Sequence, residues 1–346
     1  MAAILALMHG TAARAGAGGP AICAEAPSGR LELHCRLGQA AGRAIGGAEF
    51  GAIMALARAQ GRFERQIGAP GAAPRLAPFV IPILRHEGDI NGGNPDRPLV
   101  IGPLVLRGDP ARVRTSGIVA GAEVGVALAH AAPPGVRLGV VGAWSGATDG
   151  AAGAGIRGAR LSACLERGLA RGWFTELCAE ARRTLRRLAT TDARATTLRV
   201  GRVFTTPGRT HAEAHLGVAR ALQDFAGQRR ILGGIDAIHQ NGWQTGLALM
   251  AGSAVAGRHA VRREAVGRVR IPLGERWVRV ETRISAASGS FFFGVPRTET
   301  TLGAALVVPL WRGLRVSVGY SRTRASIDYF ATEGTSFALQ FAPIPF

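Results

Sequence analysis

Four cysteines are the residues of this sequence best suited to covalent chemistry. Cys23 and Cys35 lie near the start of the chain, and Cys164 and Cys178 lie near its middle. Neither pair has the CxxC spacing of a zinc site or a redox motif. Two close pairs suit an oxidising compartment such as the periplasm, so we expect two disulfides, Cys23–Cys35 and Cys164–Cys178.

Side chains for catalysis or metal binding do not form a recognisable pattern. His211 and His215 are four residues apart in a predicted strand, where that spacing holds a metal ion poorly. Ser162 and His211 are the nearest candidates for a hydrolase, but no G-x-S-x-G motif accompanies them. We therefore expect no enzyme activity, no metal and no cofactor, and a membrane-embedded hydrolase is only a third hypothesis.

The elements that must position these residues show an alternation of apolar and polar residues at period two. It is clearest in four segments, 261–273, 276–286, 298–310 and 314–322. Side chains of a strand point to opposite faces in turn, so each segment has one apolar and one polar face. No run approaches the roughly 20 apolar residues that a membrane helix needs, so strands would have to span the bilayer. They must close on themselves, because unpaired backbone groups cannot face hydrocarbon.

The pattern predicts an all-β fold, a closed antiparallel up-and-down transmembrane β-barrel of about 14 strands. The other predicted strands are 75–86, 115–130, 135–146, 156–168, 173–185, 193–204, 209–222, 229–239, 243–255 and 336–341. Tight turns alternate with longer connections at 88–114, 145–155 and 288–297, as expected for the two rims of such a barrel. Pro343 and Pro345 interrupt the alternation, so we expect residues 342–346 to form a tail.

The residues before the barrel have a different composition. Residues 1–16 contain a short apolar run and small residues near Ala15, which predicts a secretory signal peptide. Residues 17–74 would form a small periplasmic segment with one amphipathic helix, Ala48–Ile67, that ends at Gly68. This segment would cap the barrel or plug it, and residues 75–346 would form the barrel.

The polar face of the strands predicts which side chains point into the lumen. A hairpin that turns around Arg171 would also place Cys164 opposite Cys178 on this face, Glu166 opposite Glu176, and Ser162 opposite Glu180. Charges on the lipid side would be costly, whereas charges inside a barrel can face water. The structural interpretation is that these groups brace the strands by pairing; the functional one is a lumen that favours anions or an acidic polypeptide. The predicted lumenal residues are Glu123, Arg137, Ser162, Glu166, Glu176, Glu180, Arg182, Arg199, Arg262, Glu264, Arg268, Arg270, Arg279, Glu281, Arg283, Glu299 and Arg315.

The chain is strongly basic, with a net charge of +19, and contains no lysine. Basic proteins often bind nucleic acid through clustered positive charges. Here the arginines are spread over the strands with glutamates between them, so we expect no nucleic-acid partner.

Two short motifs resemble a known family. The segment Asp89-Ile90-Asn91-Gly92-Gly93 and the later Phe292-Phe293-Gly294-Val295-Pro296-Arg297 are similar to segments in the barrel domain of the surface lipoprotein assembly modifier family. The resemblance implies a barrel of the same strand number over about residues 76–341, acting in the movement of lipoproteins or related substrates through the outer membrane. In that family a tetratricopeptide domain precedes the barrel, whereas here we expect the short segment 17–74 in its place.

These patterns together predict a protein of the bacterial outer membrane that acts in transport or translocation. Its partners would be outer-membrane lipid, the barrel-assembly machinery and, as substrate, a secreted polypeptide or lipoprotein. Phe337, Leu339 and Phe341 share one face and resemble the assembly signal of outer-membrane barrels. The alternative is a passive pore whose arginine-rich lumen prefers anions.

Overall fold

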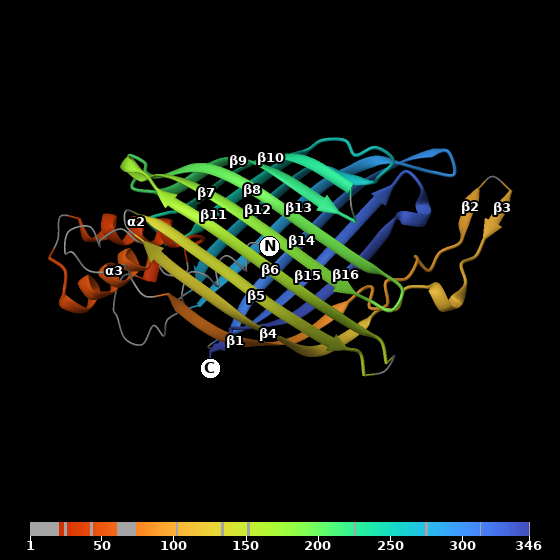
Figure 1. Cartoon of the computed structure of the whole chain (residues 1–346), viewed down its shortest axis with the longest axis horizontal. Helices are drawn as coiled ribbons and strands as arrows, with labels where there is room; N and C mark the ends of the chain where they lie inside the picture. Colours follow the sequence, from red (N-terminus) through yellow and green to blue (C-terminus); the bar gives the residue numbers. More distant parts are fainter. Residues whose placement is uncertain are drawn as a thin grey trace.

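A computed structural model describes residues 21–23, 26–41, 44–60, 74–101, 103–132, 135–150, 153–224, 226–273, 276–311 and 313–345. Within these residues, 14 antiparallel strands form a closed barrel, with two short α-helices near the N-terminus (Figure 1). The predicted signal peptide lies outside the described residues. None of the helices in the described part of the chain is long and apolar enough to cross a membrane.

Each barrel strand pairs with the strands that precede and follow it in the sequence, which is the predicted up-and-down order. The first strand, β1, also pairs with the last ones and so closes the wall. The barrel strands are β1 (Arg75–Glu87), β4 (Gly117–Ala132), β5 (Val136–Thr148), β6 (Gly155–Gly168), β7 (Trp173–Leu185), β8 (Thr190–Thr205), β9 (His211–Gln223), β10 (Ala226–Ile238), β11 (Gln244–Gly252), β12 (Ala260–Leu273), β13 (Arg276–Phe292), β14 (Val295–Trp311), β15 (Leu314–Ala325) and β16 (Thr332–Phe341). The predicted fold class and the predicted strands are confirmed.

The outer face of the wall is apolar, as the alternation requires. Leu161, Leu216 and Leu302 are 55%, 71% and 57% exposed, and each points away from the lumen. Trp173 and Trp311 are exposed at the ends of their strands, at the rim with the short turns. Apolar side chains around the wall and aromatic side chains at its border match the two environments of a lipid bilayer.

The two rims of the barrel differ (Figure 1). Six short connections join β4 to β5, β6 to β7, β8 to β9, β10 to β11, β12 to β13 and β14 to β15 at one rim. The helices α2 (Gly29–Ala40) and α3 (Gly47–Ala59) lie at this short-turn rim. We call the opposite rim the long-loop rim, because the long connection between β1 and β4 lies there. The hairpin of β2 (Leu99–Ile101) and β3 (Leu104–Leu106) belongs to that connection and projects beyond this rim.

The structure corrects two expectations about the ends of the strands. Residues 342–346 are not simply a tail, because β17 (Ile344–Pro345) resumes pairing with β1, with Ile344 opposite Val80. Pro343 interrupts the strand, but the two residues that follow it pair with β1 again. The expected loop at 288–297 is instead the end of a long β13–β14 hairpin, whose turn residues Phe293 and Gly294 both have positive φ, as tight hairpin turns require.

The N-terminal segment also differs from expectation. Helix α3 ends at Ala59, so it covers the first part of the predicted helix, and residues 61–67 of that helix lie outside the described residues. Helix α2 was not predicted at all. Ser28 caps it by accepting a hydrogen bond from the backbone N–H of Leu31 at 3.1 Å. Its apolar residues are few, so the periodicity of its sequence is weak.

Candidate transport pathway

The hairpin of β6 and β7 forms one side of the lumen at the short-turn rim. Its register is the one expected from a turn around Arg171: Glu166 lies opposite Glu176, and Ser162 lies opposite Glu180. Cys164 and Cys178 are opposite each other, with 4.1 Å between their Cα atoms, and they form a disulfide. The predicted cross-strand disulfide is confirmed, and it fixes this part of the wall.

Arg30, on the first turn of α2, reaches the lumenal face of three strands. Its guanidinium lies 2.6 Å from Glu166 of β6, 3.3 Å from Glu176 of β7 and 2.7 Å from Glu213 of β9. The side chain is 8% exposed. Burial alone would lower the pKa of Arg30, but the charges of Glu213, Glu166 and Glu176 raise it above its usual value. The arginine therefore stays charged and ties α2 to the wall.

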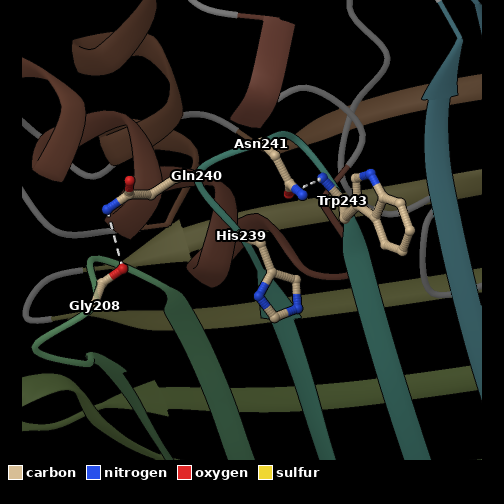
Figure 2. A pocket seen from close by; sticks show the side chains of 5 residues that line it. All are labelled: Gly208, His239, Gln240, Asn241 and Trp243. Atoms are coloured by element: carbon tan, nitrogen blue, oxygen red, sulfur yellow. Dashed lines mark hydrogen bonds between the residues drawn. The ribbon is translucent and has the colours of Figure 1, made fainter.

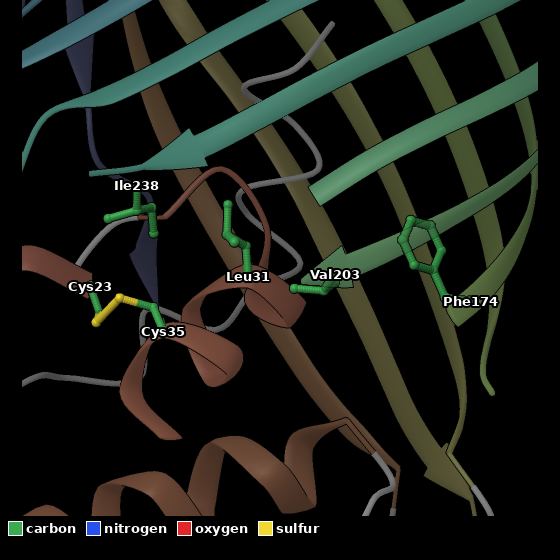
Figure 3. Close-up of a cluster of buried hydrophobic side chains, with 6 residues drawn as sticks. All are labelled: Cys23, Leu31, Cys35, Phe174, Val203 and Ile238. Carbon is green, nitrogen blue, oxygen red and sulfur yellow. A yellow bond between two sulfur atoms is a disulfide. The ribbon is translucent and has the colours of Figure 1, made fainter. Parts of the chain in front are cut away.

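An apolar contact accompanies this ion-pair cluster. Figure 3 shows α2 and the strand ends meeting through a buried group that consists of Cys23, Leu31, Cys35, Phe174, Val203 and Ile238. The predicted Cys23–Cys35 disulfide is confirmed and is part of this group. The guanidinium of Arg30 lies over the Phe174 ring, 3.7 Å from its centre. Gly201 makes room for that ring, because a Cβ atom there would lie 2.4 Å from it.

Helix α3 is held mainly by α2. Leu33 of α2 packs with Ile53 and Ala57 of α3 in a second buried apolar cluster. On its other side α2 contacts the wall again, where His34 Nε2 lies 2.9 Å from Thr205 Oγ1. The two helices, with Cys23 tied to α2 by its disulfide, are thus a single small unit at the short-turn rim, and α2 attaches it to β6, β7, β8 and β9.

Acidic side chains dominate the part of the wall that holds α2. Glu166, Glu176 and Glu213 all point at Arg30, and Glu176 is also paired with Arg199 at 3.1 Å. Arg137 of β5 lies opposite Glu166 in the ladder. Glu213 and Arg30 were not predicted as site residues. Glu213 follows the alternation of β9, so this alternation could have predicted that Glu213 points into the lumen.

In the wall from β12 to β15, the predicted lumenal residues of β12, β13 and β15 are mostly basic, while β14, between β13 and β15, contributes Glu299. Those of β12, β13 and β15 are Arg262, Glu264, Arg268, Arg270, Arg279, Glu281, Arg283 and Arg315, so arginines outnumber glutamates. Both glutamates already have an arginine partner: Arg268 Nε is 3.3 Å from Glu281, and Arg283 Nε is 3.0 Å from Glu264. Among these described residues, six arginines accompany two glutamates.

Near the short-turn rim, these basic residues are organised around one aromatic ring. Arg270 and Arg315 lie over Trp277, with 4.2 Å and 5.1 Å between guanidinium carbon and ring centre. Arg279 lies directly opposite Arg270 in the ladder between β12 and β13. Stacking on an aromatic ring orients guanidinium groups, and Arg270 Nη1 also donates a hydrogen bond to Gln244 Oε1 at 3.4 Å.

The remaining predicted residues are not part of these two groups. Glu123 forms an ion pair with Arg160, a lumenal residue that was not predicted. Arg182 lies opposite Arg160, and Glu180 lies opposite Ser162. Glu299 is bound at the long-loop end by Arg297 and by His259, at 2.5 Å and 3.2 Å.

The side chains considered for hydrolysis do not come together. Strands β7 and β8 lie between the strand of Ser162 and the strand of His211. His211 Nδ1 is 3.0 Å from Thr205 Oγ1, and its ring contacts that of His34 at 5.6 Å.

A shallow pocket at the short-turn rim is lined by Gly208, His239, Gln240, Asn241 and Trp243 (Figure 2). Its hydrogen bonds hold adjacent turns together, as in the 3.0 Å bond that Gln240 donates to the Gly208 carbonyl.

Similar solved structures share little sequence with this chain. OccAB1 of Acinetobacter baumannii is 8% identical, with 82% of this chain and 99% of that chain covered and a TM-score of 0.42. A BenF-like porin from Pseudomonas fluorescens Pf-5 is 9% identical, with 79% and 99% covered and a TM-score of 0.41. The β domain of the Bordetella autotransporter BrkA is 16% identical, with 78% and 99% covered and a TM-score of 0.32. No family model and no curated protein matches. Likeness this distant carries no argument about function.

The architecture itself identifies the class of protein. An even number of antiparallel strands, an apolar outer face, a polar lumen, and short turns at one rim are together the features of bacterial outer-membrane barrels. The strands satisfy one another's backbone groups all round the wall, which a membrane-spanning sheet requires. The protein is a β-barrel of the bacterial outer membrane.

Proposed function

We propose that this barrel is a passive pore that prefers anions and that its N-terminal segment plugs the short-turn, periplasmic end. The excess of arginine on β12, β13 and β15 is the observation that supports anion preference. A ring or row of arginines at a constriction attracts anions and excludes cations. The acidic residues are concentrated on the opposite side, where Arg30 neutralises much of their charge.

The plug is supported by the way α2 is attached. Its contacts combine one buried guanidinium, three glutamates and an apolar group built around Phe174 and Leu31. Helix α2 also contacts the wall through Ser28 at its N-cap, which donates a hydrogen bond to Glu213, and through His34, whose Nε2 lies 2.9 Å from Thr205 Oγ1. Short turns face the periplasm in bacterial barrels, so the plug would close the pore from that side. The chain from residue 17 to 74 would then regulate the pore that residues 75 to 346 form.

Ion selectivity in planar bilayers tests the proposal. We expect the reversal potential in a KCl gradient to show preference for chloride. Replacing Arg270→Gln together with Arg279→Gln should reduce that preference several-fold, because two inward charges are lost. The matched control is Arg263→Gln with Arg276→Gln, which removes two exposed arginines from the same strands. A cation-selective current, or an equal effect of both variants, would refute the proposed role of the lumen.

Translocation of a polypeptide or lipoprotein remains the second hypothesis, because two motifs resemble those of the lipoprotein assembly modifiers. The first motif has a local structural task in this chain. Asp89 Oδ1 accepts hydrogen bonds from the N–H groups of Gly92 and Gly93 at 2.7 Å and 3.1 Å. The buried Asn91 donates to the Val113 carbonyl at 2.7 Å and accepts from Thr115 at 2.9 Å. These bonds anchor the long connection between β1 and β4, which any function of the barrel could require.

A further inference from the structure

The outer face of the barrel carries a continuous row of arginines close to the long-loop rim. Close to this rim, five successive strands, β6 to β10, each contribute one exposed arginine on the face that also carries their exposed leucine, valine or isoleucine residues. We call these residues, Arg157, Arg183, Arg194, Arg220 and Arg229, the outer arginine row.

The strand registers place the members of this row side by side. Arg183 lies opposite Ala159, so its diagonal neighbour on β6 is Arg157. It also lies opposite Asp192, two residues from Arg194 on β8. Diagonal cross-strand neighbours are about 7–8 Å apart, which long side chains can bridge.

The row continues in the same way to β10. Arg194 lies opposite Leu222, so Arg220 is its diagonal neighbour on β9. Arg220 lies directly opposite Arg229. Like charges in direct opposition destabilise a sheet unless a counter-charge joins them.

The described part of the chain supplies little of that counter-charge. Asp192 is paired with Arg183 at 3.6 Å, and Asp224 accepts a hydrogen bond from the backbone of Asp192 at 3.0 Å. Among the described residues, no ion pair or side-chain hydrogen bond joins Arg157, Arg194, Arg220 or Arg229 to an acidic group. The outer arginine row therefore presents a surplus of positive charge to its surroundings.

The position of the outer arginine row relative to the apolar side chains indicates which part of the membrane surrounds it. Arg157 and Arg194 lie four residues from Leu161 and Leu198, which are exposed on the same face nearer the middle of the wall. Charged side chains on the lipid face are tolerated near the membrane interface and not at its centre. The arginines thus lie where the apolar belt ends, at the level of lipid headgroups.

We propose that the outer arginine row binds the phosphate groups of a lipid in the outer leaflet, and that the lipid carries at least two phosphates. Guanidinium groups bind phosphate oxygens through two parallel hydrogen bonds, and a row of them suits a headgroup with separated phosphates. The acyl chains of the same lipid would lie on the apolar side chains below the row. A soluble anion would use only the first of these two contacts.

Lipid titration followed by native mass spectrometry tests this proposal on the whole chain in neutral detergent. The probes are bisphosphorylated lipid A, monophosphorylated lipid A, phosphatidylcholine and inorganic pyrophosphate. We expect bisphosphorylated lipid A to bind most tightly and Arg220→Gln with Arg229→Gln to weaken that binding about 30-fold, because each interfacial arginine contributes roughly a factor of five. The matched control, Arg167→Gln with Arg276→Gln, removes two outward arginines at the short-turn rim and should change binding less than about twofold.

Heat-modifiable gel mobility establishes that each variant is folded before its lipid binding is compared. If the first pair fails to fold, Arg157→Gln with Arg194→Gln tests the same row on other strands and should weaken binding to a similar extent. Equal binding by the row variants and the control variants would overturn the proposal. Equal binding of phosphatidylcholine would also overturn it, as would complete displacement of lipid A by an equal concentration of pyrophosphate.

Discussion

Arg30 joins helix α2 to the wall at the short-turn rim. It is the only group of α2 that reaches all three of Glu166, Glu176 and Glu213 in the described residues. Glu166 and Glu176 face each other across the ladder, so without a cation between them they would repel. The side chain therefore stabilises the wall as well as the attachment of the helix.

Removing this charge should release α2 from the wall. Loss of one partner from a buried ion pair costs about 3–5 kcal/mol, because the other partner is left without compensation. In Arg30→Gln we expect backbone amides of α2 to exchange with solvent faster by about two to four orders of magnitude, measured by hydrogen–deuterium exchange. Arg58→Gln, at an exposed position of α3, is the control. Unchanged protection of α2 in Arg30→Gln would contradict the assigned role.

The Arg30 cluster could be predicted only in part from the sequence. Alternation on β6 and β7 places Glu166 and Glu176 inward, and their opposition follows from the turn at Arg171. Arg30 itself lies in a helix far from these strands in the sequence, and no periodicity relates it to them. Contacts between separate elements depend on how the elements pack, which alternation within one strand does not encode.

At the scale of single elements, the β6–β7 hairpin combines stabilising and destabilising pairs. The opposed glutamates and the Cys164–Cys178 disulfide occupy neighbouring lumenal positions. The covalent bond keeps the two strands in register where the glutamates would separate them. This hairpin is also the part of the wall that α2 contacts through Phe174.

Removing that disulfide should destabilise the barrel. A bridge that closes a loop of this length contributes about 3 kcal/mol in the chain-entropy model. We expect Cys164→Ser with Cys178→Ser to lower the free energy of unfolding by this amount, measured by urea titration in lipid vesicles. Cys23→Ser with Cys35→Ser should leave barrel unfolding nearly unchanged, because that bridge lies in the N-terminal segment and not in the wall. A similar loss in both variants would show that the bridge does not act on the wall.

Strands were the most predictable elements, because alternation at period two is a direct consequence of one lipid-facing and one water-facing side. Their ends were less predictable. The residues around Phe293 and Gly294 have the composition of a loop. Strands β13 and β14 nevertheless stay paired up to this turn. Helix α2 was missed because its buried surface includes Arg30 and Glu32, which an apolar pattern does not reveal.

The whole molecule is organised by the difference between its two faces. Leu249 and Met250 are adjacent on β11, but Leu249 is exposed on the outer face and Met250 lies opposite Glu264 in the lumen. A charge at position 249 would therefore face lipid, whereas a charge at position 250 would face the water of the lumen.

This contrast gives a direct test of which face meets lipid. Leu249→Arg should reduce the stability of the folded barrel in lipid vesicles by about 2–4 kcal/mol, because the charge would lie in hydrocarbon. Met250→Arg should cost less than about 1 kcal/mol, since it would lie near Glu264 in a polar lumen. Both values come from urea-dependent folding into vesicles, monitored by tryptophan fluorescence. The reverse order would mean that the assignment of the two faces is wrong.

The wall has one seam, where the first strand meets the last. On one side, β1 pairs with β4 along its whole length, from Arg75 to Glu87. On the other side, its partners are confined to Ile83–Arg85 with β16 and Phe79–Val80 with β17. Hydrogen bonding is thus sparsest at the junction of the two chain ends. A sideways opening of the wall toward the bilayer would begin there, and a cross-link between β1 and β16 would block it without narrowing the lumen.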